Sequence, residues 1–265
     1  MSTRVPYWHV DAFADRPFTG NQAAVMILDS WADDAVLQAI GAENNFAETA
    51  FVVADASGAA DWELRWFTPA VEIRLCGHAT LAAGHVLLGL RPELDRVTFR
   101  TRQAGILEVR REGEGLEVAL PIRRAAPARW PEAEAAMGGR ITEVWRNSDH
   151  NALFLYASEA EVRALSPDLR ALQALGIDAF TATAPGLETD IVSRVFVPGA
   201  GVDEDPVTGS AHAVLTGFWC ERLGRDRFTA FQASARGGRL DCRIDGERAW
   251  LGGQCVTVVE GQFSF

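Results

Sequence analysis

The chain has 265 residues, of which 48% are hydrophobic and 23% are charged, and its formal net charge at pH 7 is −11. This composition is typical of a globular protein, and the length allows one large domain or two of ordinary size. The acidic balance argues against nucleic acid as a partner, because phosphate binding requires a basic face, and it disfavours anionic membrane surfaces.

Two further features limit the class of protein to which the chain can belong. No stretch is long and apolar enough to span a bilayer, and the first residues lack the apolar core of a signal peptide, so we expect a soluble, cytoplasmic protein. The four cysteines, at 76, 220, 242 and 255, show no C-x-x-C pair and no zinc-ligand spacing. We therefore expect neither a disulfide framework nor a metal cluster.

The first part of the chain predicts short strands and two helices. Alternating or apolar runs bounded by turn residues predict strands over 7–13, 23–28, 50–53, 62–67, 97–100, 106–110 and 116–120. Helical spacing predicts an amphipathic helix over 33–43, with Ser30 or Asp33 as its cap, and an apolar helix over 79–88. The stretch 121–131, rich in Arg, Ala and Pro, is the best candidate for a linker.

The second part predicts a similar mixture of strands and helices. Strands are expected over 141–146, 152–157, 179–184, 191–197, 228–232, 240–244, 249–251 and 255–259. Two short helices are expected over 159–165 and 167–175, the first capped by Ser158 with Glu161 three residues later, and a longer one over 211–223 with a stop at Gly224. So many consecutive short strands favour α+β over α/β architecture.

One stretch, 204–212, combines features that suit anion binding. It has the sequence EDPVTGSAH, and it leads from an apolar run and a Pro/Gly loop into an apolar helix. Two acids, a proline and a Thr-Gly-Ser helix start are typical of a loop that presents backbone N–H groups to an anion. Taken alone, the stretch fits better an ordinary Asp or Thr N-cap before a buried helix.

A similar arrangement earlier in the chain favours the anion-binding interpretation over the ordinary N-cap. Phe-x-Pro at 67–69 is followed nine residues after the phenylalanine by Cys76, and Phe-x-Pro at 196–198 is followed at the same distance by Asp205. In both places a glycine and small residues then open an apolar helix. The pattern indicates an internal duplication that gives two half-sites, which would face each other across a cleft.

The chain resembles the phenazine-biosynthesis PhzF-like isomerase family, which shares the fold of diaminopimelate epimerase. The matching segments, spread over nearly the whole length, are VDAF at 10–13, PFTGNQAAV at 17–25, ETAFV at 48–52, FTP at 67–69 with Glu72, LCGHAT at 75–80, SRVF at 193–196, the stretch 204–212 and QASARGG at 232–238. Members of such families differ in substrate, so the resemblance implies a fold and a reaction class more firmly than one reaction.

The resemblance implies an α+β fold of two pseudo-symmetric domains. Each would be a curled, mostly antiparallel, barrel-like sheet around a central helix, at 79–88 and 211–223, with the active site in the cleft between the domains. The N-terminal domain would cover 1–120 and the C-terminal domain 130–254, with the last segment, 255–265, returning to the first domain.

Glu48 falls on the catalytic acid/base of the family. From pattern alone it fits better an exposed glutamate at a strand end, since it sits where a polar loop gives way to an apolar strand. A carboxyl group among Phe46, Ala50 and Phe51 would, however, be partly desolvated, which suits a group that takes and returns a proton.

The two half-sites differ in their proton carriers. Relatives of the diaminopimelate epimerase type use two cysteines, one from each half, whereas this chain has Cys76 in the first position and Asp205 in the second. This departure disfavours racemisation by two thiols, and it leaves Glu48, His78 and Asp205 as the expected catalytic residues. Cys76 alone would also fit a small buried side chain, and His78 alone a capping histidine at the protein surface. The expected substrate-binding residues are Gly77, Gly209, Ser210, Cys76 and Asn21.

Three functions remain open. The first is a cofactor-independent isomerase, without metal, that shifts a proton on a small, carboxylated, cyclic substrate such as trans-2,3-dihydro-3-hydroxyanthranilate. The second is an epimerase or racemase of an amino or hydroxy acid, and the third is a non-catalytic protein that binds a ligand. The resemblance also implies a homodimer.

Overall fold

The structure is a computed structural model that describes residues 3–265. The chain forms two compact units, one from Met1–Leu120 with Gly252–Phe265 and the other from Pro121–Leu251. We call them unit 1 and unit 2. Within the described residues, no helix is both long and apolar enough to cross a membrane.

Unit 1 contains most of the chain's first half and its last strand. Its helices are α1 (Asp34–Asn44) and α2 (Gly77–Leu90). Its strands are β1 (Arg4–Ala12), β2 (Asn21–Leu28), β3 (Glu48–Ala54), β4 (Trp62–Phe67), β5 (Glu72–Ile73), β6 (Arg96–Thr101), β7 (Ile106–Glu112), β8 (Gly115–Pro121) and β18 (Cys255–Ser264).

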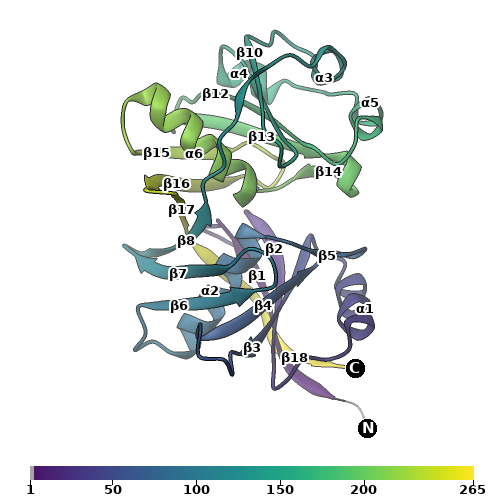
Figure 1. Ribbon diagram of the computed structural model, residues 1–265, viewed down its shortest axis with the longest axis vertical. Helices are drawn as coiled ribbons and strands as arrows, with labels where there is room; N and C mark the ends of the chain where they lie inside the picture. Colours follow the sequence, from purple (N-terminus) through teal and green to yellow (C-terminus); the bar gives the residue numbers. More distant parts are fainter. Residues whose placement is uncertain (1–2) are drawn as a thin grey trace. The chain divides into compact units, whose positions relative to one another are not determined.

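The strands of unit 1 form one curled sheet in the order β18-β1-β2-β3-β4-β6-β7-β8, and β5 pairs with β4 as a short hairpin. Only β2–β3 and β4–β6 are parallel pairs, so the sheet is mostly antiparallel, as the sequence predicted. Figure 1 shows α2 among these strands, and the sheet curls around it without closing.

Helix α2 is the centre of unit 1. Most of its residues are apolar or small on every side, a pattern that is typical of a helix buried all round. It packs against β2, β1, β3, β6 and β7. Gly84 permits the closest approach, because a Cβ atom there would lie 2.4 Å from a methyl carbon of Val109 on β7.

The other face of the sheet carries a second layer. Leu37 and Ile40 on α1 are buried against Met26, Phe51 and Phe67 from three strands. Asp33 stands at the N-cap position of α1, as predicted, although its side chain makes no capping hydrogen bond. The side chains of β2 and β3 therefore pack on both faces, against α2 on one and α1 on the other.

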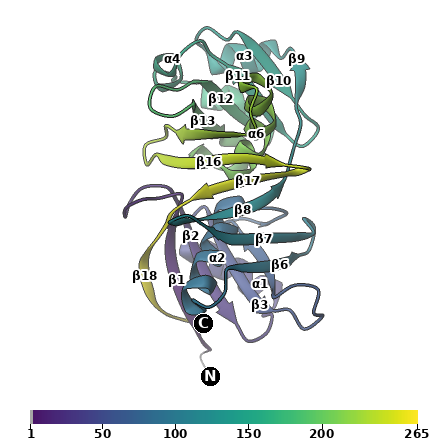
Figure 2. The same cartoon turned by 90° about the vertical axis from the view of Figure 1, so that its left-hand side faces the viewer.

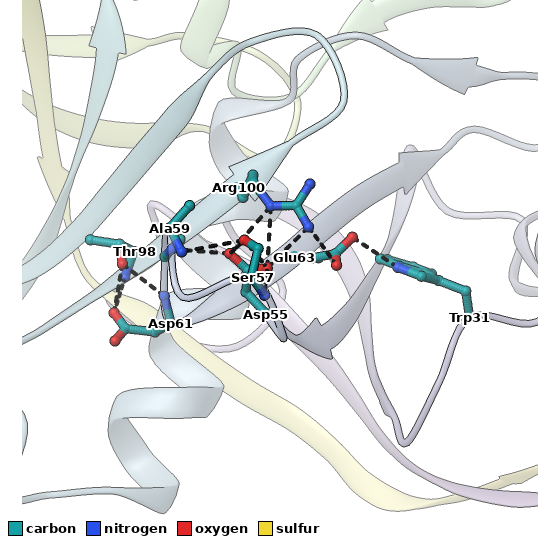
Figure 3. A network of polar contacts seen from close by, with 9 residues as sticks. Trp31, Asp55, Ser57, Ala59, Asp61, Glu63, Thr98 and Arg100 are labelled. Atoms are coloured by element: carbon teal, nitrogen blue, oxygen red, sulfur yellow. Dashed lines mark hydrogen bonds and ion pairs between the residues drawn. The ribbon is translucent and has the colours of Figure 1, made fainter.

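A polar network holds the turn between β3 and β4 (Figure 3). Asp55 accepts hydrogen bonds from the backbone and side chain of Ser57, and Arg100 on β6 donates to the same carboxylate. Hydrogen bonds from Arg100 and Ser57 hold the pKa of Asp55 below its usual range. Arg100 also pairs with Glu63, which accepts from the indole of Trp31. These acids are fully engaged in structural contacts.

Unit 2 repeats the mixture of strands and helices. Its helices are α3 (Pro131–Met137), α4 (Glu159–Arg163), α5 (Leu169–Ala174), the 3₁₀ turn η1 (Pro198–Ala200) and α6 (Gly209–Leu223). Its strands are β9 (Ala126–Ala128), β10 (Glu143–Arg146), β11 (Asn151–Leu155), β12 (Ala179–Pro185), β13 (Ile191–Val197), β14 (Val202–Asp205), β15 (Arg227–Gln232), β16 (Gly238–Asp245) and β17 (Arg248–Gly253).

The topology of unit 2 matches that of unit 1 over the strands from β1 to β7. Its sheet has the order β9-β10-β11-β12-β13-β15-β16, with parallel pairs only at β11–β12 and β13–β15. The short strand β14 pairs with β13 as β5 does with β4, and each of these short strands precedes the central helix of its unit. Figure 2 shows α6, which packs against β15 and β16, among the strands of unit 2. The predicted pseudo-symmetry is confirmed.

The outer face of unit 2 is covered by short helices. Buried residues of α3, α4 and α5 pack with Phe154 and Phe180 of the sheet in one apolar cluster. The predicted cap of α4 is confirmed, since Ser158 accepts from the backbone of Glu161, whose carboxylate accepts from the backbone of Ala157. These reciprocal bonds satisfy N–H groups that the helix itself leaves unpaired.

Three segments differ from the sequence-based expectations. The stretch 121–131 is no simple linker, because β9 lies within it and pairs with β10, and α3 begins at Pro131. The strands β5 and β14 were not predicted, since two to four residues carry too little alternation to be recognised. Glu48, which was placed in a loop before a strand, is the first residue of β3.

Candidate active site

Four predicted site residues meet at the start of α2. Nε2 of His78 lies 3.0 Å from Oε2 of Glu48, and Nδ1 of His78 lies 3.5 Å from Sγ of Cys76. The side-chain amide nitrogen of Asn21 lies 3.2 Å from the same Nδ1. The imidazole thus has a carboxylate on one nitrogen and a thiol and an amide on the other.

The sheet register explains why these residues meet. Glu48 on β3 pairs with Ala23 on β2, and Asn21 precedes Ala23 by two residues on the same strand. Side chains two residues apart point to the same face of a sheet, so Glu48 and Asn21 both point to the face covered by α2. Cys76 and His78 stand at the beginning of that helix.

The cluster is largely removed from solvent. His78 is 3% exposed, Cys76 5% and Asn21 1%, whereas the side chain of Glu48 is 15% exposed. Glu48 is therefore the member of the cluster that a ligand reaches first, and it has the partly desolvated surroundings that the sequence suggested.

His78 has an unusual charge state for a buried histidine. Burial by itself lowers the pKa of His78, but the electrostatic interactions and hydrogen bonds with Cys76 and Glu48 outweigh burial. The result is a pKa well above the ordinary value of 6.5. His78 is therefore an imidazolium at neutral pH.

Cys76 has the opposite tendency. Burial raises the pKa of its thiol to about 11, and the negative charge of Glu48 adds to this effect. The sulfur is thus a neutral thiol at neutral pH. The anion that faces the imidazolium under these conditions is the carboxylate of Glu48.

The Asn21 amide is coupled to the protonation of His78. An amide nitrogen can only donate, so its present place beside Nδ1 suits an imidazole whose proton is on Nε2. A proton on Nδ1 requires the amide to turn and present its oxygen. The imidazolium assigned to His78 therefore requires the opposite orientation of this amide from the one in the structure.

The helix start adds backbone donors to the cluster. Cys76 is the N-cap residue of α2 and makes no side-chain capping bond, and Thr80 closes the first turn through its hydroxyl, 2.5 Å from the carbonyl oxygen of Cys76. The first backbone N–H groups of a helix have no partner within the helix, and they favour negative charge. Gly77 and His78 therefore present N–H groups that suit a carboxylate.

The corresponding helix start in unit 2 is held by a different network. Asp205 ends β14 and accepts a hydrogen bond of 2.5 Å from the hydroxyl of Thr208. Gln232 accepts from the backbone N–H of Thr208 and donates to the carbonyl oxygen of Asp205. These bonds fix the Asp205 carboxylate at the approach to α6.

His212 lies within the first turn of α6 and is fully buried. Its Nδ1 lies 2.8 Å from the carbonyl oxygen of Thr208, and its Nε2 lies 3.3 Å from the hydroxyl of Ser193. Burial lowers the pKa of His212 to about 4, and the bond to Thr208 opposes this only in part. His212 is therefore a neutral imidazole that donates from Nδ1 and accepts at Nε2.

Comparisons with known proteins identify the family of this chain. The model of the phenazine biosynthesis-like (PhzC-PhzF) family matches residues 10–261. An uncharacterized isomerase of Pseudomonas aeruginosa is 46% identical over 98% of both chains. The crystal structure of a PhzF-family protein from Enterococcus faecalis covers 98% of this chain and 99% of its own, at 38% identity and a TM-score of 0.90.

The chain belongs to the PhzC-PhzF family. The resemblance inferred from the sequence is thus confirmed, and the chain is a member of a family of isomerases. A solved hydroxyproline epimerase from Agrobacterium vitis, 10% identical, covers 99% of this chain and 93% of its own with a TM-score of 0.65. At that identity it shows a shared fold alone.

The structure brings together one of the two predicted half-sites of this PhzC-PhzF protein. Glu48, Cys76, His78 and Asn21 are in contact around the start of α2, where Gly77 also lies. Asp205, Gly209 and Ser210 lie at the start of α6 in unit 2, and the prediction that the half-sites face each other stays a prediction.

Several contributing residues were missed in the sequence. Thr208 and Gln232 fix Asp205, although no spacing between positions so far apart predicts that contact. His9 was given no role, yet its ring stacks on Phe46, two residues before Glu48, with 4.3 Å between the centroids. The strand pairing of β1, β2 and β3 would be needed to place it there.

Proposed function

We propose that this chain is a cofactor-independent isomerase that shifts a proton on a small, carboxylated, cyclic substrate such as trans-2,3-dihydro-3-hydroxyanthranilate. The observation that carries the proposal is the pair of Glu48 and His78 at the start of α2, 3.0 Å apart and mostly buried. A carboxylate beside an imidazolium, at the one edge of the cluster open to a ligand, suits general acid/base chemistry.

Glu48 acts as the proton carrier in this proposal. Its carboxylate takes a proton from one carbon of the substrate, the electron pair of that C–H bond shifts along the adjacent double bond, and the new carboxylic acid returns the proton to a second carbon. No proton is gained or lost overall. Because one group serves both steps, the proton leaves and arrives on the same face of the substrate.

The start of α2 has a matching role. The N–H groups of Gly77 and His78 would bind the substrate carboxylate and stabilise negative charge that develops on the neighbouring carbon. The imidazolium of His78 would hold Glu48 in place and orient a polar substituent of the substrate. The family resemblance assigns three residues of unit 2 to the same substrate: Asp205, Gly209 and Ser210. It also assigns Asn21 and Cys76, which in addition contact His78.

The test is proton NMR in D₂O with purified protein and trans-2,3-dihydro-3-hydroxyanthranilate. We expect conversion with uptake of deuterium in the wild type, and a rate at least ~100-fold lower in Glu48→Gln, because a positioned acid/base contributes on the order of 10²–10⁴-fold. Substrate affinity, measured by calorimetry, should change little, because glutamine keeps the size and polarity of the side chain.

Glu43→Gln is the matched control, since Glu43 is an exposed glutamate on the neighbouring helix α1. It should leave the exchange rate unchanged. Full turnover in Glu48→Gln would remove Glu48 from the proposed role. An inert wild type would reject this substrate and direct the search to other small carboxylic acids.

A second candidate function, epimerisation of an amino or hydroxy acid, is favoured by the contact between Cys76 and His78. A neutral thiol can act as an acid, so Glu48 would remove the substrate proton and Cys76 would deliver its own thiol proton to the same carbon, after which the carboxylic acid loses its proton to solvent and the thiolate regains one from solvent. Inversion of a single stereocentre, with deuterium incorporated at that carbon and loss of activity in Cys76→Ser, would identify this reaction. Binding of substrates without any exchange would instead identify a non-catalytic member of the family.

A further inference from the structure

The Glu48–Cys76–His78 cluster has a property that the sequence did not suggest. A carboxylate oxygen of Glu48, Sγ of Cys76 and a ring nitrogen of His78 all lie within 4.8 Å of one another. The sequence argued against a metal cluster because no two cysteines have zinc-ligand spacing. The structure instead assembles three different donors, one from β3 and two from the start of α2.

The distances are close to those of a tetrahedral zinc site. With Zn–S near 2.3 Å and Zn–N and Zn–O near 2.0–2.2 Å, neighbouring ligand atoms lie roughly 3.3–3.6 Å apart. Nε2 of His78 lies 4.0 Å from Sγ of Cys76 and 3.0 Å from Oε2 of Glu48. Shifts of a few tenths of an ångström would bring these two distances to the tetrahedral values, and the distance from Sγ to the carboxylate, at most 4.8 Å, would shorten as the three donors close on the ion.

The surroundings of the donors also fit. Oε2 of Glu48 is buried, and within the described chain no hydrogen-bond donor is aligned with it; its ion-pair contact is with Nε2 of His78, whose proton the metal would replace. With a metal on Nε2, the other ring nitrogen, Nδ1, carries a proton and needs an acceptor, which the Asn21 amide, 3.2 Å away through its nitrogen, would supply by turning its oxygen toward Nδ1. Such outer partners hold a ligating histidine in its tautomer and orientation.

The donor set selects the kind of metal. Thiolate and imidazole favour borderline and soft ions such as Zn²⁺, whereas Mg²⁺ and Ca²⁺ prefer sites made of oxygen ligands. Three protein ligands leave a fourth position of a tetrahedral ion open to water or to an anion. Binding expels the protons of the thiol and of the imidazolium to solvent, and it changes no oxidation state.

We propose that Glu48, Cys76 and His78 form a reversible Zn²⁺ site and that its occupation switches off the proton transfer assigned to Glu48. The binding claim stands on the geometry of the three donors, and the inhibition claim rests on the proposed function. A carboxylate oxygen bound to Zn²⁺ cannot accept the substrate proton, and the ion would occupy the space beside Glu48 into which the substrate must reach.

Binding is tested with Co²⁺, which reports thiolate ligation in Zn²⁺ sites by a charge-transfer band. The full-length protein is treated with chelator, dialysed and titrated with Co²⁺ and then with Zn²⁺. We expect one equivalent of Co²⁺ to give a thiolate band that one equivalent of Zn²⁺ removes. Mg²⁺ should have no effect.

The variants identify the ligands. Cys76→Ser should lose the thiolate band and bind Zn²⁺ at least about tenfold more weakly, because even outer-shell changes cost on the order of 10–100-fold in affinity. Cys220→Ser, which changes a cysteine of unit 2, should behave as the wild type. Cys76→Ala is tested beside Cys76→Ser, and circular dichroism confirms that each variant is folded. A thiolate band that survives in a folded Cys76 variant would overturn the site.

Inhibition is measured separately in the deuterium-exchange assay. Zn²⁺ should abolish exchange and a chelator should restore it. If the wild type gives the thiolate band but converts no substrate, the proposed function fails and the metal site stands. If it converts substrate without a band, or converts it at full rate with Zn²⁺ bound, the present proposal fails and the proposed function stands.

Discussion

The starts of α2 and α6 are equivalent in topology but differ in the charge of their histidines. Despite burial, interactions with Cys76 and Glu48 raise the pKa of His78 well above its ordinary value. Burial lowers the pKa of His212 to about 4. Among the described residues, the hydrogen-bond partners of its ring nitrogens are a carbonyl oxygen and a hydroxyl oxygen. One local fold thus delivers an imidazolium or a neutral imidazole, and the nearby carboxylate decides which.

The largest expected effect lies in the activity at the first helix start. His78→Gln removes the charge that faces Glu48, and we expect the exchange rate to fall by about 100-fold or more, the usual contribution of an acid/base group. The deuterium-exchange assay measures this.

His85→Gln is the control for His78→Gln, because His85 lies on the same helix, two turns further on, and contacts Thr257. It should leave the rate within a few-fold of the wild type. Equal losses in the two variants would mean that His78 acts only through the stability of α2.

The second effect is the acid sensitivity of His212. A histidine with a pKa of about 4 when folded and 6.5 when unfolded binds a proton more readily in the unfolded state. Its contribution to stability is present above pH 6.5 and is lost as the pH falls toward 4. By linkage this amounts to about 3 kcal/mol between pH 7 and pH 4. Urea unfolding of the wild type and His212→Gln over this range measures it.

His212→Gln should lack the part of the acid-induced loss of stability that comes from His212, whatever the stability of the variant at pH 7. His150→Gln, which changes an exposed histidine, should keep the acid loss of the wild type.

For His78 the pH dependence has the opposite sign. Its raised pKa gives a contribution to stability that is complete below pH 6.5 and declines as the pH rises through the pKa of the folded state. His78→Gln should therefore lose more stability at pH 6 than at pH 10. An equal loss at both would contradict the charge assigned to His78.

The smallest effect tests what the two helices share. Thr80 donates to the carbonyl oxygen of Cys76 at 2.5 Å, and Thr216 donates to that of His212 at 2.7 Å. Each is a neutral hydrogen bond, worth about 1 kcal/mol. Thr80→Val and Thr216→Val should therefore lower the free energy of unfolding by similar amounts in denaturant titrations. A much larger loss at Thr80 would show that the first turn of α2 depends on Cys76 being held in place.

Most of the fold follows from local patterns. The strand Trp62–Phe67 alternates clearly and was predicted to the residue, and the mostly apolar or small residues of α2 and α6 predicted two central helices. The short strands β5, β9 and β14 were missed because they exist only through their partners. A neighbouring strand stabilises each of them, and the sequence of two to four residues does not reveal that partner.

The candidate site shows the same division. Cys76, Gly77 and His78 are adjacent in sequence, and their helix start was recognised from it. Glu48 came from the family resemblance, since on local pattern alone it fitted an exposed strand end. The three metal donors, Glu48, Cys76 and His78, have no recognisable spacing in the sequence, because zinc sites are recognised there by paired cysteines. The register of β2 and β3 brings the carboxylate to a single cysteine and a histidine.

The pairing of β1 with β18 has a consequence for the order in which the protein is made. The first strand of the chain has β2 on one side and the final strand on its other side, with Arg4 opposite Ser264. Every strand of unit 2 leaves the ribosome before β18 does, so unit 2 can be complete while unit 1 still lacks an edge. During translation this edge of β1 lacks its partner until β18 emerges, and unpaired edges are prone to aggregation. The N-terminal half of this protein is thus synthesised first and finished last.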